Sequence, residues 1–444
     1  MLLLFVICKI VLMLYFRSFL FRIALWVVSI LFIIISFFCA LYIRIFLNKI
    51  RDKPRIVWGS DPIINNSYWS KSMQQIGYTS ETFTTDFYST INKRSDWGII
   101  ISEKYKYILF PLKPFFAFIE SLFKYDLFII PFNGFFVGFT PVRFLQDKIF
   151  KLAKKKVIVI PYGSDSYVYR RIRSTSTLHG LLMSYPRSSR VQNKIAKNVD
   201  YWIKNADAVL PGIMGPDGFG RWDVLTPTSL CINLNLWSKS IKNSVADGKV
   251  MKVVIAHCPN HKGFKGSEFI ERAINTLKEE GYLIEYLLLE KIQNNEIRRL
   301  FNEHVDILVE QIICTGHGFN AIEGMASGLP TISNLENEDY ILPFRRWSFF
   351  NECPLVSGTP ENLVDVLRKL ITRPELRMEL GRAGREYVEK YHGFDSAQYL
   401  FTNIINYVYG KRDTLINLYH PILGEYTNRS PKIKHPLVNN RIVD

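Results

Sequence analysis

The chain has 444 residues, 48% of them hydrophobic and 22% charged, which excludes a disordered or fibrous protein and is typical of about two to three globular domains. The formal net charge is +16, and a basic protein usually meets an acidic partner: nucleic acid, an anionic membrane or a phosphorylated substrate. Residues 1–250 contain 33 Lys and Arg against 15 Asp and Glu, whereas residues 251–444 contain 23 against 25. The basic surface therefore belongs to the N-terminal half.

The six cysteines show neither a disulfide framework nor a zinc site. No two of them form a CxxC pair, and two lie in the apolar N-terminal sequence. They are Cys8, Cys39, Cys231, Cys258, Cys314 and Cys353. No group of His, Asp and Glu has the spacing of metal ligands either, so no metal and no other cofactor is expected.

The first predicted element is a membrane-spanning helix. Residues 23–43 contain no charge, are bracketed by Arg22 and Arg44, and would form a helix of about 31 Å, enough to cross the hydrocarbon core. Residues 1–16 are also apolar but contain Lys9, so we expect a second span, a re-entrant piece or an interfacial helix there, and a single-pass or hairpin anchor overall. More basic residues follow the span than precede it, which predicts that the globular part faces the cytoplasm. The alternative is a buried core helix.

From position 54 on, short apolar runs alternate with helical patterns, which indicates an α/β fold with mostly parallel sheets. The predicted strands of the N-terminal half are 55–60, 126–132, 154–165 and 207–212, and its predicted helices are 62–77, 144–152 and 187–206. After a polar hinge the pattern restarts with strands 252–257, 284–290, 305–311 and 330–334, and with helices 267–280, 295–302, 321–327, 360–371 and 374–391. Two successive units leave a cleft where the carboxyl ends of strands bind ligands. The tail, 412–444, is predicted to be irregular.

The first motif with chemical content is HCPNHKGFKGSEF at 257–269, which follows a predicted strand. Lys262 and Lys265 stand beside Gly263 and Gly266, just before a helix N-terminus, and such a loop suits a diphosphate. It is not a Walker A loop, which requires GxxxxGK[ST]. The competing interpretation is a solvated basic turn.

The second motif is GHGFNAIEGMASGLP at 316–330. Gly316 and Gly318 allow backbone amides to approach a ligand closely. Glu323 stands at the start of the following helix, where a carboxylate can accept two hydroxyl groups of a ribose. The competing interpretation is a first-turn glutamate favoured by the helix dipole.

These two segments, in this order and at this spacing, resemble the GT-B glycosyltransferases of the large retaining family 4. The resemblance continues in 359–391, which is similar to the closing helices of that family, and more weakly in KKKVIVIPYGSD at 154–165 and NADAVLPG at 205–212. It implies two Rossmann-like domains that face a cleft, preceded here by the N-terminal transmembrane helix. The predicted domains are a membrane anchor (1–50), an acceptor domain (51–245), a nucleotide-sugar donor domain (246–395), and a closing helix with a tail (396–444).

The resemblance also implies donor-binding roles. Lys265 would contact the donor diphosphate, residues at the start of the second motif would present backbone amides, and Glu323 matches the second glutamate of the E-x7-E motif, which holds the ribose. The donor-binding residues implied in this way are His261, Lys262, Lys265, Gly266, Glu310, His317, Gly318, Phe319, Asn320 and Glu323. The donor itself would be a UDP- or GDP-linked sugar.

This sequence departs from the family pattern at two positions. Thr315 occupies the place of the first glutamate of E-x7-E, and Asn260 occupies the place of the usual phosphate-binding arginine. Glu310 or His317 is a candidate to replace the missing glutamate. The GT-B type needs no metal, because positive side chains and helix dipoles stabilise the leaving nucleoside diphosphate.

In the N-terminal half the candidate residues lie on two strand-to-helix loops. Asp165 follows the third predicted strand and is predicted to contact the acceptor or act as a base, with Tyr162 where relatives often have His. The alternative for Asp165 is a turn carboxylate that caps nearby amides. Gly59, Ser60 and Asp61 form the first strand-to-helix loop, which in such folds approaches the donor phosphates.

The segment KYKYILFPLKPFFAFIESLFKYD at 104–126 mixes aromatic residues and lysines. It predicts an amphipathic stretch at the membrane interface, with a core helix as the alternative. The expected acidic partners are therefore an anionic membrane and a lipid-linked saccharide acceptor. Nucleic acid is not expected, because no module that reads RNA or DNA is present.

Taken together, the sequence predicts a membrane-anchored glycosyltransferase, retaining and metal-independent, which transfers a sugar from a nucleotide donor to a lipid-linked acceptor for surface polysaccharide or glycoconjugate assembly. Two alternatives remain. One is a nucleotide-sugar epimerase of GT-B fold. The other is a catalytically inactive, membrane-anchored partner subunit, which Thr315 keeps open.

Overall fold

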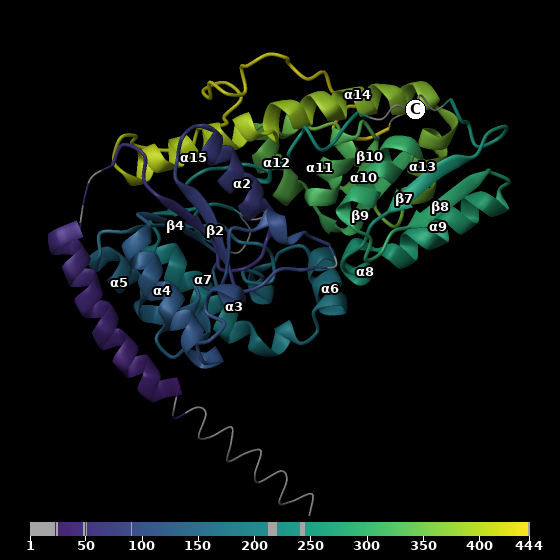
Figure 1. Ribbon diagram of the computed structural model, residues 1–444. Helices are drawn as coiled ribbons and strands as arrows, with labels where there is room; N and C mark the ends of the chain where they lie inside the picture. Colours follow the sequence, from purple (N-terminus) through teal and green to yellow (C-terminus); the bar gives the residue numbers. More distant parts are fainter. Residues whose placement is uncertain are drawn as a thin grey trace, which may run out of the picture.

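The structure is a computed structural model that describes residues 23, 25–47, 49, 51–89, 91–211, 220–239 and 245–442 (Figure 1). The predicted apolar segment 1–16 lies outside these residues. The described chain forms two parallel β-sheets flanked by helices, which confirms the α/β class expected from the sequence.

The first sheet has six strands in the order β3-β2-β1-β4-β5-β6, and all neighbouring strands are parallel. The strands are β1 Ile56–Trp58, β2 Ser80–Thr84, β3 Ile99–Ile100, β4 Leu127–Ile130, β5 Lys156–Val159 and β6 Ala208–Val209. Every residue of β1 and β4 is buried, as expected for parallel strands that are covered on both faces. The strand order reverses between β1 and β4.

The second sheet has five strands in the order β11-β10-β9-β7-β8, again parallel. The strands are β7 Val253–His257, β8 Ile284–Leu288, β9 Ile307–Thr315, β10 Thr331–Asn334 and β11 Val356–Ser357. Here the order reverses between β7 and β9. Both sheets therefore have the doubly wound topology in which a crevice opens at the reversal point.

Helices connect the strands and cover the sheets. In the first half they are α2 Ile64–Gln75, α3 Ile101–Lys104, α4 Lys113–Lys124, α5 Gln146–Leu152, α6 Thr175–Ser184 and α7 Gln192–Asn205. In the second half they are α8 Lys262–Lys265, α9 Ser267–Glu279, α10 Asn294–Glu303, α11 Phe319–Ala326, α12 Glu338–Trp347, α13 Leu363–Thr372, α14 Pro374–Tyr391 and α15 Phe394–Val408. In α9 the buried apolar residues recur every three or four positions, which turns one stripe of the helix toward the sheet.

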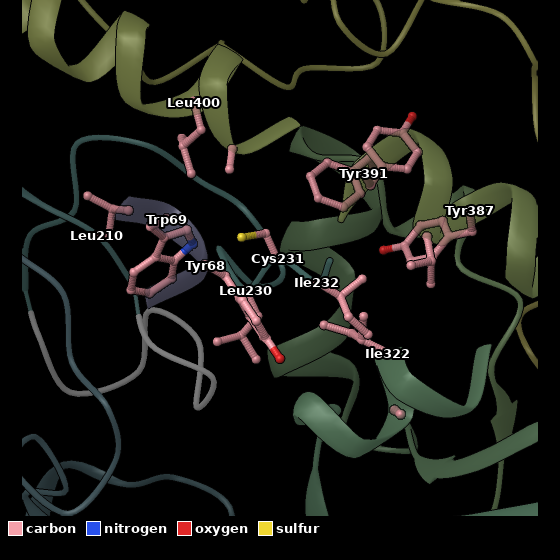
Figure 2. Close-up of a cluster of buried hydrophobic side chains, with 14 of the residues drawn as sticks. Tyr68, Trp69, Leu210, Leu230, Cys231, Ile232, Ile322, Tyr387, Tyr391 and Leu400 are labelled. Atoms are coloured by element: carbon pink, nitrogen blue, oxygen red, sulfur yellow. The ribbon is translucent and has the colours of Figure 1, made fainter. Parts of the chain in front are cut away.

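The two halves share one apolar core. Helix α15 crosses back to the first half, where Phe401 lies edge-on to Trp58 with ring centroids 4.8 Å apart (Figure 1). In the cluster shown in Figure 2, Trp69 from α2 lies near Leu230, and Ile322 of α11 belongs to the same cluster. This shared core fixes the position of one sheet relative to the other.

Every strand and helix predicted above has a counterpart, with shifted ends. Strand β9 continues to Thr315, beyond the predicted end at 311. The sequence analysis missed β2, β3 and β11, together with α3, α6, α8 and α12. The predicted irregular tail contains no helix or strand within its described part, 412–442.

The segment 104–126 is only partly the interfacial stretch that was predicted. Its C-terminal part is helix α4, whose Phe115, Phe118 and Leu122 are buried in the core of the first half, as the alternative prediction had it. Tyr107 and Phe110, which precede the helix, are 89% and 81% exposed. One face of the segment is therefore core and the rest is an exposed apolar surface.

One helix, Leu25–Leu47, is long and apolar enough to cross a membrane by length and composition. It is called the N-terminal helix below. It lies beside α4 and α5 at the edge of the first half (Figure 1). Length and composition alone do not decide whether it crosses the bilayer, because core helices and signal sequences share both properties.

Candidate functional site

The candidate site lies at the reversal points of the two sheets, where ligands of doubly wound folds bind. Segments that follow the strands at these points contact one another across the halves. Tyr68 of α2 stacks on Phe319 of α11 with ring centroids 6.1 Å apart, and Tyr167 stacks on Phe264 of α8 at 6.4 Å. The crevices of the two sheets therefore face each other.

Lys265 forms the centre of a buried polar cluster in the second half. Its ammonium group contacts the carboxylate of Glu310 and lies 2.9 Å from the side-chain oxygen of Gln311, both on β9. Glu310 also accepts hydrogen bonds from the backbone N–H of Gly318 and the hydroxyl of Ser333, each at 3.2 Å. Lys265 is 7% exposed and Glu310 is 1% exposed, so this is a buried ion pair with additional hydrogen bonds. The structure thus brings together three of the predicted donor residues, Lys265, Glu310 and Gly318.

Glu323 is a buried residue of α11, the helix that begins just after Gly318. Its carboxylate accepts hydrogen bonds from the side-chain amides of Asn294 at 2.9 Å and Asn320 at 3.2 Å. Burial raises the pKa of Glu323 to about 7, although both amides and the charge of Arg298 act in the opposite direction. A carboxylate that is this poorly solvated gains from any further hydrogen-bond donor.

Three polar atoms between β9 and the first turn of α11 are buried and have no hydrogen-bond partner in the described part of the chain. They are the hydroxyl oxygen of Thr315, Nε2 of His317 and the side-chain oxygen of Asn320. Buried polar atoms are normally satisfied, so three in one short stretch indicate a site completed by a ligand or water. The ring of His317 lies 6.0 Å from that of Phe350, and burial lowers its pKa to about 3, which keeps it neutral.

The other basic residues of the first motif have partners outside this cluster. Lys262 forms a surface ion pair with Glu290 at 2.9 Å, and the His261 ring packs against Tyr185 with centroids 4.5 Å apart. Of the three basic residues predicted for the diphosphate, the structure places only Lys265 in the cluster.

Predicted loop residues next to the reversal points serve close packing. Gly266 has φ +81° and a Cβ atom there would lie 2.6 Å from a side chain of β9. A Cβ atom on Gly59 would lie 2.1 Å from a backbone oxygen of β2. The hydroxyl of Ser60 donates to the backbone oxygen of Gly134 at 3.4 Å. These residues position the loops, and none of them directs a charged group into the site.

A small pocket of about 50 Å³ opens at the reversal point of the first sheet, with Gly59, Asp61, Pro131 and Tyr162 in its lining. The side-chain amide of Asn133 donates to the Tyr162 hydroxyl at 2.8 Å beside it. One carboxylate oxygen of Asp61 is buried and has no partner within the described residues. Burial raises the pKa of Asp61, partly offset by hydrogen bonds from Asn133 and Tyr162. Asp61 is therefore a buried carboxylate of the first half with one oxygen available to a ligand.

Asp165, predicted as the base, occupies a different environment. One of its oxygens accepts from the backbone N–H of Phe132 at 3.0 Å, and the other from those of Tyr162 and Gly163 at 3.1 and 3.0 Å. Its side chain is buried, and burial raises its pKa to about 7. These bonds match the alternative prediction of a turn carboxylate. Through these bonds Asp165 joins the segment after β4 to the loop after β5.

Helix α6 closes one side of the cleft. It belongs to the first half but packs on α8 and the end of β9, where the Ser184 hydroxyl accepts from the Phe264 N–H at 2.8 Å. The Thr177 hydroxyl accepts from the N–H of Thr315 at 3.5 Å. The sequence analysis missed this helix and therefore also its contacts with α8 and β9, which carry the Lys265 cluster.

Other residues of the site also escaped prediction because they come from separate segments. Gln311 and Ser333 contact the Lys265 cluster, and Asn294 and Arg298 reach Glu323 from α10. One signal was available: the adjacent Glu310 and Gln311 interrupt an otherwise apolar strand. Among the described residues no group of three or more His, Cys, Asp and Glu is arranged to hold a metal ion.

No family model matches the sequence, and the comparison with curated proteins finds no match. Solved structures with a similar chain course include WaaG, a glycosyltransferase involved in lipopolysaccharide biosynthesis, at 11% identity over 79% of this chain and 99% of that chain, with a TM-score of 0.41. They also include S. aureus MnaA with UDP at 11% identity, 80% and 97% coverage and a TM-score of 0.43. A putative UDP-N-acetylglucosamine 2-epimerase from Listeria monocytogenes has 10% identity, 83% and 100% coverage and a TM-score of 0.38. Similarity at this level carries no argument about activity.

Proposed function

We propose that this protein is a glycosyltransferase that takes a sugar from a nucleotide donor and transfers it to a membrane-associated, lipid-linked acceptor. The observation that carries the proposal is the convergence, at the reversal point of the second sheet, of a buried lysine, a poorly solvated glutamate and three unpaired polar atoms. A nucleoside diphosphate offers the matching groups, because it combines negative charge with neighbouring ribose hydroxyls.

In this proposal Lys265 and the first turn of α11 stabilise the charge that develops on the leaving diphosphate. Glu323 accepts hydrogen bonds from the ribose hydroxyls, with Asn294 and Asn320 holding its carboxylate in place. Glu310 takes the position of the missing first glutamate and reaches the donor sugar from beside Lys265. The chain's own residues supply the charge stabilisation, in line with a metal-independent reaction.

The acceptor would enter from the first half. Asp61 is the candidate to bind or deprotonate the acceptor hydroxyl, since it lines the pocket together with Tyr162 and one of its oxygens has no partner within the described residues. The basic charge of this half and the N-terminal helix support a membrane location for the acceptor. We take retention of configuration from the sequence resemblance.

The experiment that tests this proposal measures transfer of radiolabel from a panel of UDP- and GDP-sugars into the lipid extract of membranes. We expect transfer by the wild-type protein and none by Lys265→Ala or Glu323→Ala. The matched control is Lys252→Ala, because Lys252 is also paired with a glutamate, Glu285, but on the surface of the same half. Wild-type rates in Lys265→Ala or Glu323→Ala would refute the donor-site assignment.

The same experiment separates the alternatives. Conversion of a nucleotide sugar to its epimer without any acceptor would identify an epimerase. Absence of reaction with every donor, together with intact binding to membranes, would identify an inactive partner subunit. Either result would overturn the proposed transferase activity.

A further inference from the structure

The N-terminal helix packs lengthwise on the first half of the molecule. Its Phe32 ring lies 4.7 Å from that of Phe115 and 5.5 Å from that of Phe118, near the start of α4, and Tyr42 lies 6.5 Å from Phe123 at the end of α4. The two helices therefore run side by side in the same direction. The residues of the N-terminal helix that are buried against the protein are Ser29, Phe32, Ser36, Ala40 and Ile43. We call these residues the inner face.

The inner-face residues recur every three or four positions, so they form one stripe along the helix. On the opposite side, apolar side chains are about half exposed or more. This outer face consists of Val27, Ile30, Leu31, Ile34, Ile35, Phe38 and Ile45, with exposed fractions from 50% to 63%. The sequence of the helix is mostly apolar, and tertiary packing divides it into a covered face, which includes Ser29 and Ser36, and an uncovered one.

The outer face presents seven exposed apolar side chains on one side of a helix, and such a patch is typical of an interaction site or a membrane-binding site. It is continued by exposed apolar side chains near α4: Tyr107, Leu109 and Phe110 are 74% to 89% exposed, and Phe116 is 50% exposed. The lysine Lys106 lies 4.7 Å from the centre of the Tyr107 ring. Aromatic and aliphatic groups interleaved with lysines fit the acyl chains and anionic headgroups of a lipid leaflet.

An upright orientation across the bilayer conflicts with the same packing. A helix of 23 residues is about 34 Å long, and α4 lies alongside it, so an upright N-terminal helix would carry α4 into the hydrocarbon. The ion pairs Lys104–Glu120 and Lys124–Glu81 lie on and beside α4, and each of their side chains is about one third exposed. Placing such charged side chains in the hydrocarbon core costs free energy, whereas placing them among headgroups or in water does not.

We propose that the N-terminal helix lies in the plane of the membrane, with its outer face among the acyl chains of one leaflet and its inner face bound to the protein. The protein is then held flat on the membrane by a helix that does not cross it. This inference rests on the membrane-association part of the proposed function and does not depend on glycosyl transfer. It replaces the transmembrane orientation predicted from the sequence.

The test measures depth at three outer-face positions, Val27, Ile34 and Ile45, in the full-length protein bound to phosphatidylglycerol-containing vesicles. A spin label carried by a non-canonical amino acid avoids the native cysteines. The depth of each label is measured from the ratio of its collision rate with oxygen to its collision rate with a water-soluble nickel complex. An in-plane helix places all three labels at one shallow depth of about 5–10 Å below the headgroups. An upright helix separates the first label from the last by about 27 Å along the membrane normal.

A depth profile with its maximum at Ile34 and both ends at opposite surfaces would overturn the inference. Labels shielded from both lipid and water would also overturn it, because the outer face would then be covered by a second protein copy. As an independent arm, Ile34→Asp with Phe38→Asp should lower the fraction of protein bound to vesicles at least tenfold. The matched control is Val250→Asp with Ile422→Asp, two residues 82% and 81% exposed outside the N-terminal helix, which should bind as the wild type does. Unchanged binding of the Ile34 and Phe38 variant would refute the proposal, and donor binding in detergent verifies its folding.

Discussion

Replacing Glu323 by Gln should make the ligand-free protein more stable at alkaline pH while it weakens donor binding. The carboxyl group has its ordinary pKa of 4.5 in the unfolded chain, and burial raises the pKa to about 7 in the folded protein. The folded protein therefore holds one proton more than the unfolded chain between these values, so the free energy of unfolding falls as pH rises through this window. A pKa shift of this size lowers the free energy of unfolding above pH 7 by about 3 kcal/mol relative to its value at acidic pH.

The Glu323→Gln variant has no charge to desolvate at this position, so its free energy of unfolding should not fall in this way as the pH rises. The Gln side chain accepts from only one of Asn294 and Asn320, and the lost hydrogen bond costs about 1 kcal/mol. We expect a net gain of about 2 kcal/mol at pH 8, which raises the melting temperature by roughly 2–5 °C. At pH 4.5, where the folded carboxyl group is protonated, no such gain is expected. Asp165 also titrates near neutral pH, but it is present in both proteins and its contribution cancels in the difference.

The assay is thermal unfolding followed by tryptophan fluorescence at pH 4.5 and pH 8, with and without UDP. Ribose hydroxyls that donate to Glu323 favour its ionised form, so UDP affinity in the wild type should fall about tenfold from pH 7.5 to pH 6. The Gln variant should bind UDP weakly at both values. Glu296→Gln is the control, because Glu296 lies on the neighbouring helix α10 and is solvent-accessible. Equal melting temperatures for the wild type and Glu323→Gln at pH 8, or equal UDP affinity, would refute the assignment of Glu323.

Three further substitutions test the rest of the site. Lys265→Met should lower the free energy of unfolding by about 3–5 kcal/mol, because it leaves Glu310 buried without a counter-charge. Adding Glu310→Gln should restore much of the stability without restoring transfer. Urea unfolding measures the stability, and the transfer assay measures the activity. Asp165→Asn should cost about 1–3 kcal/mol, because at least one of three backbone N–H groups loses its acceptor, and a melting curve like that of the wild type would contradict this. Asp61→Asn should leave the melting temperature within about 2 °C of the wild type but reduce transfer at least a hundredfold, and transfer at the wild-type rate would exclude Asp61 as acceptor base.

Local sequence patterns were sufficient for the strands at the centre of each sheet. Strand β4 is a continuous apolar run, and α9 repeats its apolar residues every three or four positions, so both could be assigned without tertiary information. Helices α6 and α12 were missed for physical reasons. Helix α6 has no apolar stripe, because its buried residues are Thr177, Gly180 and Leu181 while Leu182 and Met183 are exposed. Helix α12 contains Pro343 in its interior.

The resemblance to the GT-B glycosyltransferases also placed Lys265, Glu310 and Glu323 in one candidate site. It could not decide which of these side chains contact each other. The pairing of Lys265 with Glu310 depends on the register of α8 against β9, and the bonds of Asp165 depend on how the loop after β5 meets the end of β4.

By itself the sequence determined the periodicity, the charge distribution and the apolar length of the N-terminal helix, because these are properties of residues in order along the chain. Only the tertiary structure decided which carboxylate of the first half keeps a free oxygen, Asp61 and not Asp165. It also decided that the N-terminal helix has an inner and an outer face, since burial is a property of neighbours in space. The excess of positive charge in residues 1–250 therefore lies in the half of the molecule that carries this helix.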